Sequence, residues 1–329
     1  MTDSVLRLER LEVDFLGETD VVSAVSDVSL SVAPGEVVGI VGESGCGKST
    51  LALATMGLLT GRTRVGGSIN FDGQELVGLP EKQRRKLRGD RMAMVFQDPL
   101  TSLDPTYGIG EQVAEAIRAH RDVTKSEARE RALVLLKDVG IPAAERRYDD
   151  PPHRLSGGMR QRVVVAAAVA NDPSLLIADE PSTALDVTIQ AQILELLLAM
   201  RERHGTAIML ITHDLGVVAQ VCDRVAVMYA GQLIETAPVA ELFRSPRHPY
   251  TEALLAAQPT SGLERGKLRV IEGEVANLAD PPPGCRFAPR CPLAYEACSE
   301  RPAMTAAGPG HRVACWARSS ADVSAEAAS

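Results

Sequence analysis

Apolar and polar residues alternate along residues 5–33 of the chain. Apolar side chains recur at every second position, as at Leu6 and Leu8 and again at Val28 and Leu30. A period of two places these side chains on one face of a strand, so we expect this stretch to form strands with one buried face.

Four short runs are apolar throughout, which is typical of strands that are buried on both faces of a parallel sheet. They lie at residues 37–41, 92–96, 175–178 and 207–211. Helical patterns begin at Lys48, dominate residues 98–172 and return at residues 188–203. The alternation of strands with helices predicts an α/β fold, with helices around a parallel core sheet and a helical insertion within it.

No stretch of the chain is apolar for long enough to cross a bilayer. The longest uninterrupted apolar run that we find covers residues 163–170, whereas a membrane-spanning helix needs about 20 such residues. Acidic residues are scattered through residues 1–16, which argues against a signal peptide. We therefore expect the chain to stay in the cytoplasm. Its net charge of −8 argues against a nucleic-acid partner.

The composition changes after residue 245, where Pro and Gly become frequent and four of the six cysteines fall. This change predicts a main domain over residues 1–245, with a helical subdomain at about 98–172, and a small extension over residues 246–316. Residues 317–329 are rich in Ser and Ala, and we expect them to be disordered.

A glycine-rich loop follows the first buried strand. Residues 42–50 match the pattern G-x-x-x-x-G-K-[ST] and precede a helical stretch, as a phosphate-binding loop requires. The glycines let backbone N–H groups point into one concavity, and the helix start adds partial positive charge. Lys48 is expected to reach the β- and γ-phosphates of a nucleotide, and the Ser49 hydroxyl to bind Mg²⁺. The expected nucleotide contacts are Gly42, Ser44, Gly45, Cys46, Gly47, Lys48, Ser49 and Thr50.

Two carboxylates follow the apolar run at residues 175–178. Because neighbouring strand residues point to opposite faces, Asp179 and Glu180 can take different roles. Asp179 suits the Mg²⁺ shell, and Glu180 suits polarisation of an attacking water while Mg²⁺ and Lys48 stabilise charge on the phosphates. The expected chemistry is attack of water on the phosphates of a bound nucleotide.

A third motif separates this chain from other nucleotide-binding enzymes. Residues 155–162 read Leu-Ser-Gly-Gly-Met-Arg-Gln-Arg and lead directly into a helix. Here the sequence resembles the ABC-transporter ATPase family, whose signature is L-S-G-G-x. Gln97 resembles the Q-loop glutamine, residues 182–186 with Asp186 resemble the D-loop that lies at the nucleotide, and His213 resembles the switch histidine. The resemblance covers residues 5–245 and implies a P-loop fold with an added antiparallel β subdomain.

The resemblance also implies individual roles. Gln97 would link Mg²⁺ or the attacking water to the membrane partner, and His213 would contact the γ-phosphate. Phe15 resembles the aromatic residue that stacks on adenine, but it lies a few residues farther from Lys48 than expected. A phenylalanine of the core is the alternative reading of Phe15.

The signature motif implies a dimer. Ser156, Gly157 and Gly158 begin a helix, so they form a second N-terminus that can bind an anion. By resemblance, this end meets the γ-phosphate held by a partner subunit, and two subunits clamp each ATP between them. Closure can do work only if the nucleotide binds the closed state better than the open one.

The tail narrows the family. Residues 247–251 contain His-Pro-Tyr-Thr, and residues 280–292 resemble the extension of subunits that serve dipeptide, oligopeptide and nickel importers. This branch implies a peripheral protein at the cytoplasmic face of the cell membrane. Its expected partners are two permease subunits, a second ATPase subunit and an extracytoplasmic solute-binding protein. The resemblance favours a heterodimer with that second ATPase, and a homodimer is the alternative. The expected function is ATP hydrolysis that energises the import of dipeptides or oligopeptides, and import of nickel or another small solute is the alternative. The sequence says little about the cargo itself, because the ATPase never touches it.

Four cysteines of the extension form a candidate metal site: Cys285, Cys291, Cys298 and Cys315. A disulfide is not expected in a reducing cytoplasm, and a core-poor module gains stability from a metal. The spacing matches neither the tight pairs of zinc modules nor the usual ferredoxin pattern, so zinc, a cluster or free thiols remain open. The family resemblance favours a [4Fe–4S] cluster with a structural or regulatory role.

Two other classes of ABC protein fit less well. Translation factors carry two such domains in one chain, and repair proteins insert long coiled coils or zinc modules, and neither feature occurs here. A degenerate regulatory ATPase would lack Glu180 or the signature motif, and both are intact.

Overall fold

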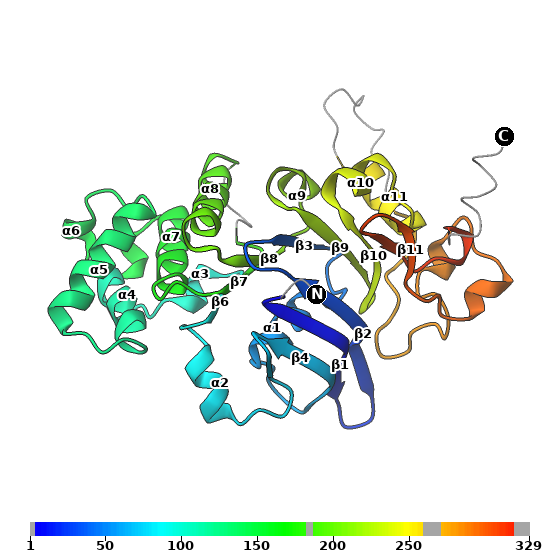
Figure 1. Cartoon of the computed structure of the whole chain (residues 1–329), viewed down its shortest axis with the longest axis horizontal. Helices are drawn as coiled ribbons and strands as arrows, with labels where there is room; N and C mark the ends of the chain where they lie inside the picture. Colours follow the sequence, from blue (N-terminus) through cyan, green and yellow to red (C-terminus); the bar gives the residue numbers. More distant parts are fainter. Residues whose placement is uncertain (1–3, 182–186, 259–270, 319–329) are drawn as a thin grey trace. The chain divides into compact units, whose positions relative to one another are not determined.

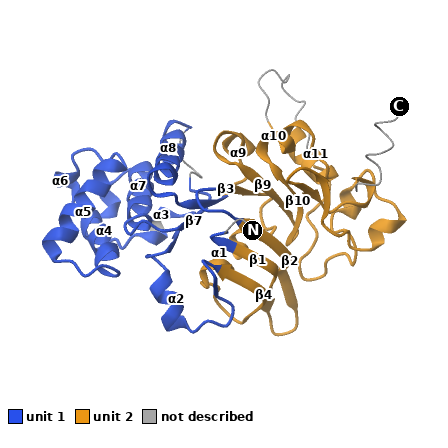
Figure 2. Cartoon of the chain, in the orientation of Figure 1, with its two compact units in different colours: residues 1–6, 32–36, 71–210 blue, residues 7–31, 37–70, 211–329 orange. Residues whose placement is uncertain are grey.

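The computed structural model describes residues 4–181, 187–258 and 271–318 of the chain (Figure 1). The chain divides into two compact units, each made of segments that are distant in sequence (Figure 2). Unit 1 contains residues 1–6, 32–36 and 71–210, and unit 2 contains residues 7–31, 37–70 and 211–329. Among the described residues, no helix combines the length and the apolar character that a bilayer crossing requires.

Unit 1 combines short buried strands with a group of helices. Its elements in chain order are β5 (Gln74–Glu75), α2 (Glu81–Leu87), β6 (Met92–Val95), α3 (Pro99–Ser102), α4 (Ile109–Arg118), α5 (Lys125–Asp138), α6 (Ala144–Arg147), η1 (Pro152–Arg154), α7 (Gly157–Ala168), β7 (Leu175–Asp179), α8 (Val187–His204) and nearly all of β8 (Ala207–Ile211).

The strands of unit 1 come from the predicted apolar runs. β6 pairs in parallel with β7, with Met92 opposite Leu175 and Val95 opposite Ala178, and β8 lies next to β7. Every residue of β6, β7 and β8 is buried, as expected for strands that are covered on both faces. The three strand predictions in this unit are confirmed to within one residue.

Local signals and close packing shape the helices of unit 1. α5 begins with a capping box, in which the Thr124 hydroxyl accepts the Glu127 N–H (3.2 Å) and the Glu127 carboxylate accepts the Thr124 N–H (2.8 Å). Gly110 lets α4 approach the buried ring of Tyr148, because a Cβ there would lie 2.1 Å from a ring carbon. α4 and α5 both pack against α7, and α3 to α7 lie where the sequence predicts helices.

Unit 2 contains the C-terminal end of the described chain. Its elements are most of β1 (Leu6–Leu16), β2 (Val21–Val32) and β4 (Thr63–Phe71), together with β3 (Val37–Val41), α1 (Lys48–Met56), α9 (Leu215–Val221), β9 (Arg224–Tyr229), β10 (Gln232–Pro238), α10 (Val239–Arg244), α11 (Pro249–Ala256), η2 (Ala288–Arg290), η3 (Glu296–Ser299), β11 (Thr305–Gly308), β12 (His311–Val313) and η4 (Trp316–Arg318).

Unit 2 holds two groups of paired strands. The first has the order β2-β1-β4 and is the antiparallel subdomain, whose β1 and β2 bury alternate residues as the sequence predicts. In the second, β3 pairs in parallel with β9, with Val38 opposite Arg224. β9 and β10 then form an antiparallel hairpin, because the turn residues Ala230 and Gly231 both have positive φ (43° and 83°).

The C-terminal extension adds strands to this second group. β12 pairs antiparallel with β10, with Glu235 opposite Val313, and β11 pairs antiparallel with β12. The sheet of unit 2 is therefore mixed, because antiparallel strands extend the parallel pairing that the sequence predicts. The predicted tail begins inside η4, and its residues 319–329 lie outside the described part of the chain.

Candidate functional site

The glycine-rich loop runs from the end of β3 to the start of α1, as predicted. Gly42 and Gly47 have φ of 155° and 102°. A Cβ on Gly42 would lie 2.1 Å from the carbonyl oxygen of Met228, and one on Gly47 would lie 2.3 Å from that of Ala24. Side chains at these positions would collide with backbone, so the glycines are required by the path of the loop.

Lys48 is folded back onto this loop. Its side chain is buried, and Nζ donates hydrogen bonds to the carbonyl oxygens of Gly42 (2.8 Å) and Glu43 (2.9 Å). The Sγ of Cys46 lies 3.9 Å from Nζ. Burial raises the pKa of the Cys46 thiol more than the charge of Lys48 lowers it, so Cys46 stays neutral. Ser49 is the second residue of α1 and is exposed.

The acidic pair lies in unit 1 at the end of β7. Asp179 is the last residue of the strand and is 5% exposed. Glu180 follows with a φ of 46°, a left-handed conformation that is rare for a residue with a side chain. The Nε2 of Gln97 donates to the Oε2 of Glu180 over 3.1 Å. The structure thus places Gln97 next to Glu180, and the sequence analysis expects both residues to act on the attacking water.

The signature motif begins α7 of unit 1. Ser156 is the N-cap residue, and its Oγ accepts the N–H of Met159 over 3.3 Å. Gly158 lies close to α8, because a Cβ there would be 2.7 Å from the Cγ2 of Ile189. The predicted helix start at Ser156 and Gly157 is confirmed.

The remaining predicted residues are spread over the chain. His213 follows β8 in unit 2 and is exposed, and the next residue, Asp214, caps α9 by accepting the N–H of Gly216 (2.8 Å). Phe15 is half-buried near the end of β1. Asp186 and the rest of the predicted D-loop, residues 182–186, lie outside the described residues. The nucleotide loop and His213 belong to unit 2, whereas Gln97 and the acidic pair belong to unit 1.

The four cysteines of the extension lie near one another without forming a metal site. Burial raises the pKa of the Cys285 and Cys291 thiols, and that of Cys315 to about 11. Smaller contributions come from neighbouring thiols, including that of Cys298. Yet no group of three or more potential ligand side chains in the described ranges is placed to hold a metal ion. This geometry does not support the [4Fe–4S] cluster, which stays a prediction.

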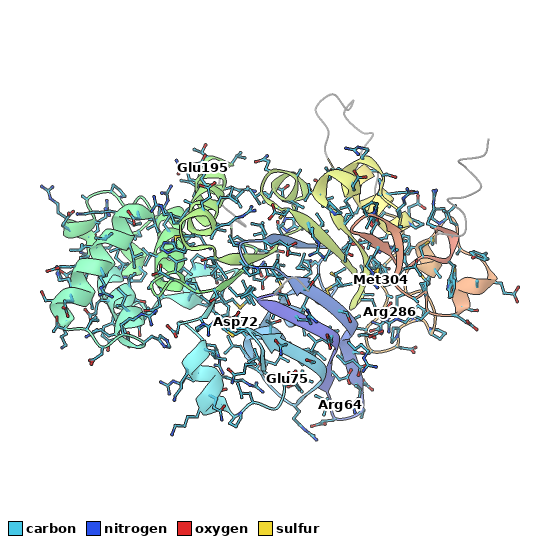
Figure 3. The ribbon with its side chains drawn as sticks, viewed as in Figure 1. Arg64, Asp72, Glu75, Glu195, Arg286 and Met304 are labelled. Carbon is cyan, nitrogen blue, oxygen red and sulfur yellow. The ribbon has the colours of Figure 1, made fainter. Side chains whose placement is uncertain are left out.

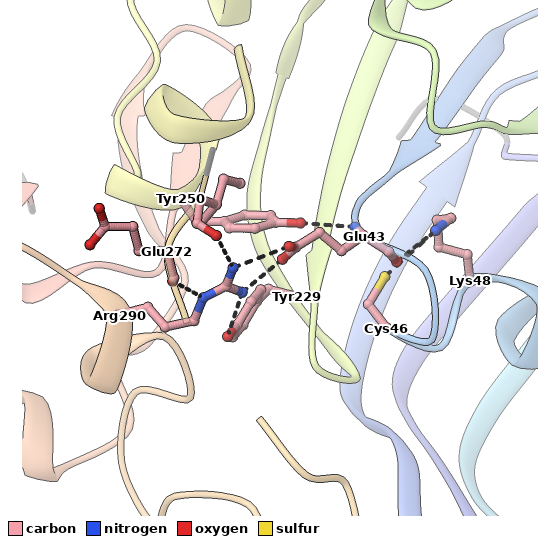
Figure 4. A network of polar contacts seen from close by, with 8 residues as sticks. Glu43, Cys46, Lys48, Tyr229, Tyr250, Glu272 and Arg290 are labelled. Carbon is pink, nitrogen blue, oxygen red and sulfur yellow. Dashed lines mark hydrogen bonds and ion pairs between the residues drawn. The ribbon is translucent and has the colours of Figure 1, made fainter. Parts of the chain in front are cut away.

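Sequence reasoning missed a set of contacts between the glycine-rich loop and the extension (Figure 4). The guanidinium of Arg290 pairs with the carboxylate of Glu43, with N–O distances of 2.9 and 3.2 Å. The hydroxyl oxygen of Tyr250 accepts the N–H of Glu43 over 2.9 Å. Tyr250 belongs to the His-Pro-Tyr-Thr motif that the sequence analysis identified. The motif did not indicate that Tyr250 contacts Glu43.

A buried carboxylate fastens the same element to the sheet. Glu235 on β10 is fully buried and accepts the N–H groups of Arg247 (2.6 Å) and His248 (2.9 Å). Its Oε1 also lies 2.7 Å from Nε2 of His311 on β12. Burial alone would raise the pKa of Glu235, but these hydrogen bonds hold it below its ordinary value. The carboxylate therefore remains charged inside the protein.

A cavity of about 410 Å³ lies beside β10 in unit 2. Arg286 and Met304, labelled in Figure 3, are among its lining residues. Arg286 is buried and donates a hydrogen bond to the carbonyl oxygen of Ala230. Burial and the charge of Arg301 lower the pKa of Arg286. Nothing in the sequence indicated this cavity.

Two protein-family models match the chain. The model described as ABC transporter matches residues 25–183. The model described as the C-terminal region of oligopeptide/dipeptide transporters matches residues 234–298.

Similar proteins cover nearly the whole chain. The "Probable peptide ABC transporter ATP-binding protein y4tR" of Sinorhizobium fredii is 51% identical, with 95% of each chain covered. The dipeptide transport ATP-binding protein DppD of Escherichia coli is 49% identical, with 95% of this chain and 96% of DppD covered. The oligopeptide transport ATP-binding protein AppD of Bacillus subtilis is 46% identical, over 95% of this chain and 96% of AppD.

Solved structures agree with these relatives. A dimeric ATP-binding cassette in a post-hydrolysis state, bound to ADP and Pi, has a TM-score of 0.65 and 29% identity, and it covers 71% of this chain and 98% of its own. The protein cbiO1 from Clostridium perfringens, part of the ABC transporter complex cbiONQ, has a TM-score of 0.62 and 31% identity, with coverage of 74% and 92%. The chain therefore belongs to the ATP-binding subunits of ABC transporters, in the dipeptide and oligopeptide branch.

Proposed function

We propose that this chain hydrolyses ATP to energise the import of dipeptides or oligopeptides through a membrane permease. The observation that carries the proposal is the glycine-rich loop, whose path admits no side chain at Gly42 or Gly47 and which holds the buried ammonium of Lys48. The names of the relatives support the peptide cargo.

Each site residue has a role that its chemistry supports. Lys48 would exchange its two carbonyl partners for phosphate oxygens and stabilise the charge that develops there. The Ser49 hydroxyl and the Asp179 carboxylate are oxygen donors of the type that Mg²⁺ prefers, and the ion supplies further positive charge. Glu180 would accept a proton from the attacking water, and the hydrogen bond from Gln97 orients its carboxylate.

Dimer closure would couple hydrolysis to transport. The backbone N–H groups at the start of α7, behind Ser156, would receive the γ-phosphate held by a second subunit. His213 and Asp186 would contact the same nucleotide, and Phe15 would stack on its adenine. The contacts from the start of α7 and from His213 require the γ-phosphate, so ATP would bind the closed dimer better than the open one. Hydrolysis would then weaken the closed dimer.

The partners follow from the branch of the family. We propose two permease subunits, a second ATPase subunit paired with this chain, and an extracytoplasmic solute-binding protein. In this assembly the chain would be peripheral, at the cytoplasmic face of the membrane.

The [4Fe–4S] cluster on the four cysteines stays a prediction. Its support is that all four lie in one small extension and interact electrostatically. Because no three of them are placed as metal ligands, binding would require the sulfur atoms to draw together. Iron and acid-labile sulfide are measured after anaerobic purification. Stoichiometric iron and sulfide would support the cluster, and their absence would eliminate it.

The substitution Glu180→Gln tests the catalytic proposal. The variant is expected to bind ATP as the wild type does and to lose at least about 100-fold in turnover, because an amide cannot accept the proton. Glu195→Gln is the matched control, since Glu195 is exposed on α8 of the same unit. Unchanged hydrolysis by Glu180→Gln would remove Glu180 from its role.

Reconstitution in vesicles tests the cargo. The chain is combined with the permease, the second ATPase and the solute-binding protein, and ATP hydrolysis is measured with dipeptides, oligopeptides or Ni²⁺ as the solute. Stimulation by peptides is expected. Stimulation by Ni²⁺ alone would assign the chain to a nickel importer instead.

A further inference from the structure

Arg290 of the extension uses its whole guanidinium group to hold other atoms in place. Its side chain is only 5% exposed, and it lies at the end of the short helix η2, between Cys285 and Cys291. A guanidinium has five N–H donors. Two of them bind the carboxylate of Glu43, one binds the hydroxyl of Tyr229 (3.3 Å), and two bind backbone carbonyls at residues 271 (3.1 Å) and 272 (2.9 Å). Every donor has an acceptor, which defines one position for the group (Figure 4).

The partner of Arg290 is a residue of the nucleotide loop. Glu43 directly follows Gly42 and is held at three separate points. Its carboxylate binds Arg290, its N–H donates to the hydroxyl oxygen of Tyr250, and its carbonyl oxygen accepts from Lys48. Two of these three anchors come from the chain beyond residue 245, and all of the residues belong to unit 2.

Aromatic packing keeps the two anchors in position. The rings of Tyr229 and Tyr250 lie 4.7 Å apart, and each lies within 5.4 Å of Phe287, which is three residues before Arg290. Tyr250 and Phe287 are buried. Burial raises the pKa of Tyr250, so its hydroxyl stays protonated and neutral at physiological pH. The loop therefore rests against a rigid surface that the extension helps to build.

Nucleotide binding makes these anchors more important. Lys48 donates to the carbonyls of Gly42 and Glu43. Phosphate oxygens would compete for the same ammonium, so nucleotide binding would weaken the loop's own contact to Lys48. The contacts from Arg290 and Tyr250 then remain to hold Glu43. Arg290 also neutralises the carboxylate of Glu43, which would otherwise repel the phosphates from inside the loop.

We propose that Arg290 and Tyr250 are positioning residues for ATP, through which the C-terminal extension holds the phosphate-binding loop in its binding-competent form. The inference rests on the proposed function, because it concerns the affinity of the same site. If the loop is competent only a tenth of the time without Arg290, the apparent Kd for ATP rises about tenfold.

The proposal is tested by a calorimetric titration of the full chain with ATP and Mg²⁺, which gives the Kd for ATP. Arg290→Met and Tyr250→Phe are expected to raise the Kd about tenfold and about threefold, respectively. The matched control is Arg244→Met, which breaks an exposed ion pair with Glu241 in the same unit and should leave the Kd unchanged. In the assembled transporter, the KM for ATP is expected to rise with little change in kcat, since no reacting group is removed.

A double-variant cycle separates positioning from a loss of structure. In a Glu43→Gln background there is no ion pair to lose, so Arg290→Met should change the Kd less than about threefold. An equally large effect in both backgrounds would mean that Arg290 does not act through Glu43. If Arg290→Met does not fold, the variants Tyr250→Phe and Glu43→Gln test the proposal in its place. A wild-type Kd for ATP in both variants would overturn the proposal. Failure of the wild type to bind ATP would instead reject the proposed function, and the inference with it.

Discussion

His248 makes the C-terminal extension sensitive to acid. It lies at the N-cap of α11, is 1% exposed, and its Nδ1 accepts the N–H of Tyr250 over 3.0 Å. Only a ring without a proton on Nδ1 can accept this bond. Protonation of His248 would therefore release the start of the helix that carries Tyr250 to the nucleotide loop.

The size of the effect follows from the pKa. Burial lowers the pKa of His248 from 6.5 to about 4, although the charge of Glu235 acts in the opposite direction. Because the pKa of His248 is lower in the folded state, its contribution to the free energy of unfolding is fully present above the unfolded pKa. This contribution is lost as the pH falls from the unfolded pKa toward the folded pKa. Between about pH 7 and about pH 5, this linkage amounts to about 2 kcal/mol. The pKa of Glu235 is also lowered from its ordinary value of 4.5. The stability that Glu235 contributes is therefore lost only below the pH range of this comparison.

The test compares the wild type with His248→Asn, because Asn can cap a helix but does not titrate. Unfolding by guanidinium chloride is followed at both pH values through Trp316, which reports on unit 2 as the single tryptophan of the chain. The wild type should lose about 2 kcal/mol more than the variant on acidification. His153→Asn, an exposed histidine, is the control and should keep the wild-type slope. Equal pH slopes for the wild type and His248→Asn would refute the reasoning.

Three further substitutions test other parts of the structure. Gly47→Ala should weaken ATP binding by at least about 100-fold in a titration, because its Cβ would meet the carbonyl of Ala24; a wild-type Kd would show that the loop can shift. Glu235→Gln should lower the free energy of unfolding by about 3 kcal/mol, measured by Trp316 fluorescence, since it breaks a buried charged network; a loss below about 1 kcal/mol would contradict this. Thr124→Ala removes the helix cap of α5 and should lower the free energy of unfolding by about 1 kcal/mol, measured by circular dichroism during unfolding. An unchanged free energy of unfolding would show that the cap contributes nothing.

Local patterns predicted most of the secondary structure. Strands that are covered on both faces must be apolar throughout, so β3 lies at the predicted residues and β6, β7 and β8 lie within one residue of them. The glycine-rich loop was equally readable, because its glycines are forced by backbone collisions a few residues from a buried strand. The mixed sheet was not predicted, since a purely local reading of β10 does not reveal that β12 pairs with it.

The cysteine site shows the limit of reading residue types without geometry. Four thiols in one extension indicated a metal site, and the family resemblance favoured a [4Fe–4S] cluster. Their pairwise electrostatic interactions show that the thiols are near one another. Ligation also requires distances and directions that residue spacing does not determine. Cys315 is buried and the other three cysteines are half-buried, and no three potential ligand side chains of the described residues are placed to hold a metal ion.

The sequence by itself determined the class of the protein, because phosphate binding and the signature helix need particular residues at short, fixed spacings. Only the tertiary structure decided what supports the phosphate-binding loop. Glu43 and Arg290 are 247 positions apart, and neither residue stands in a pattern that names the other. Their pairing results from the packing of α11, η2 and β9 around three aromatic rings, and such packing depends on shape in three dimensions rather than on the order of residues.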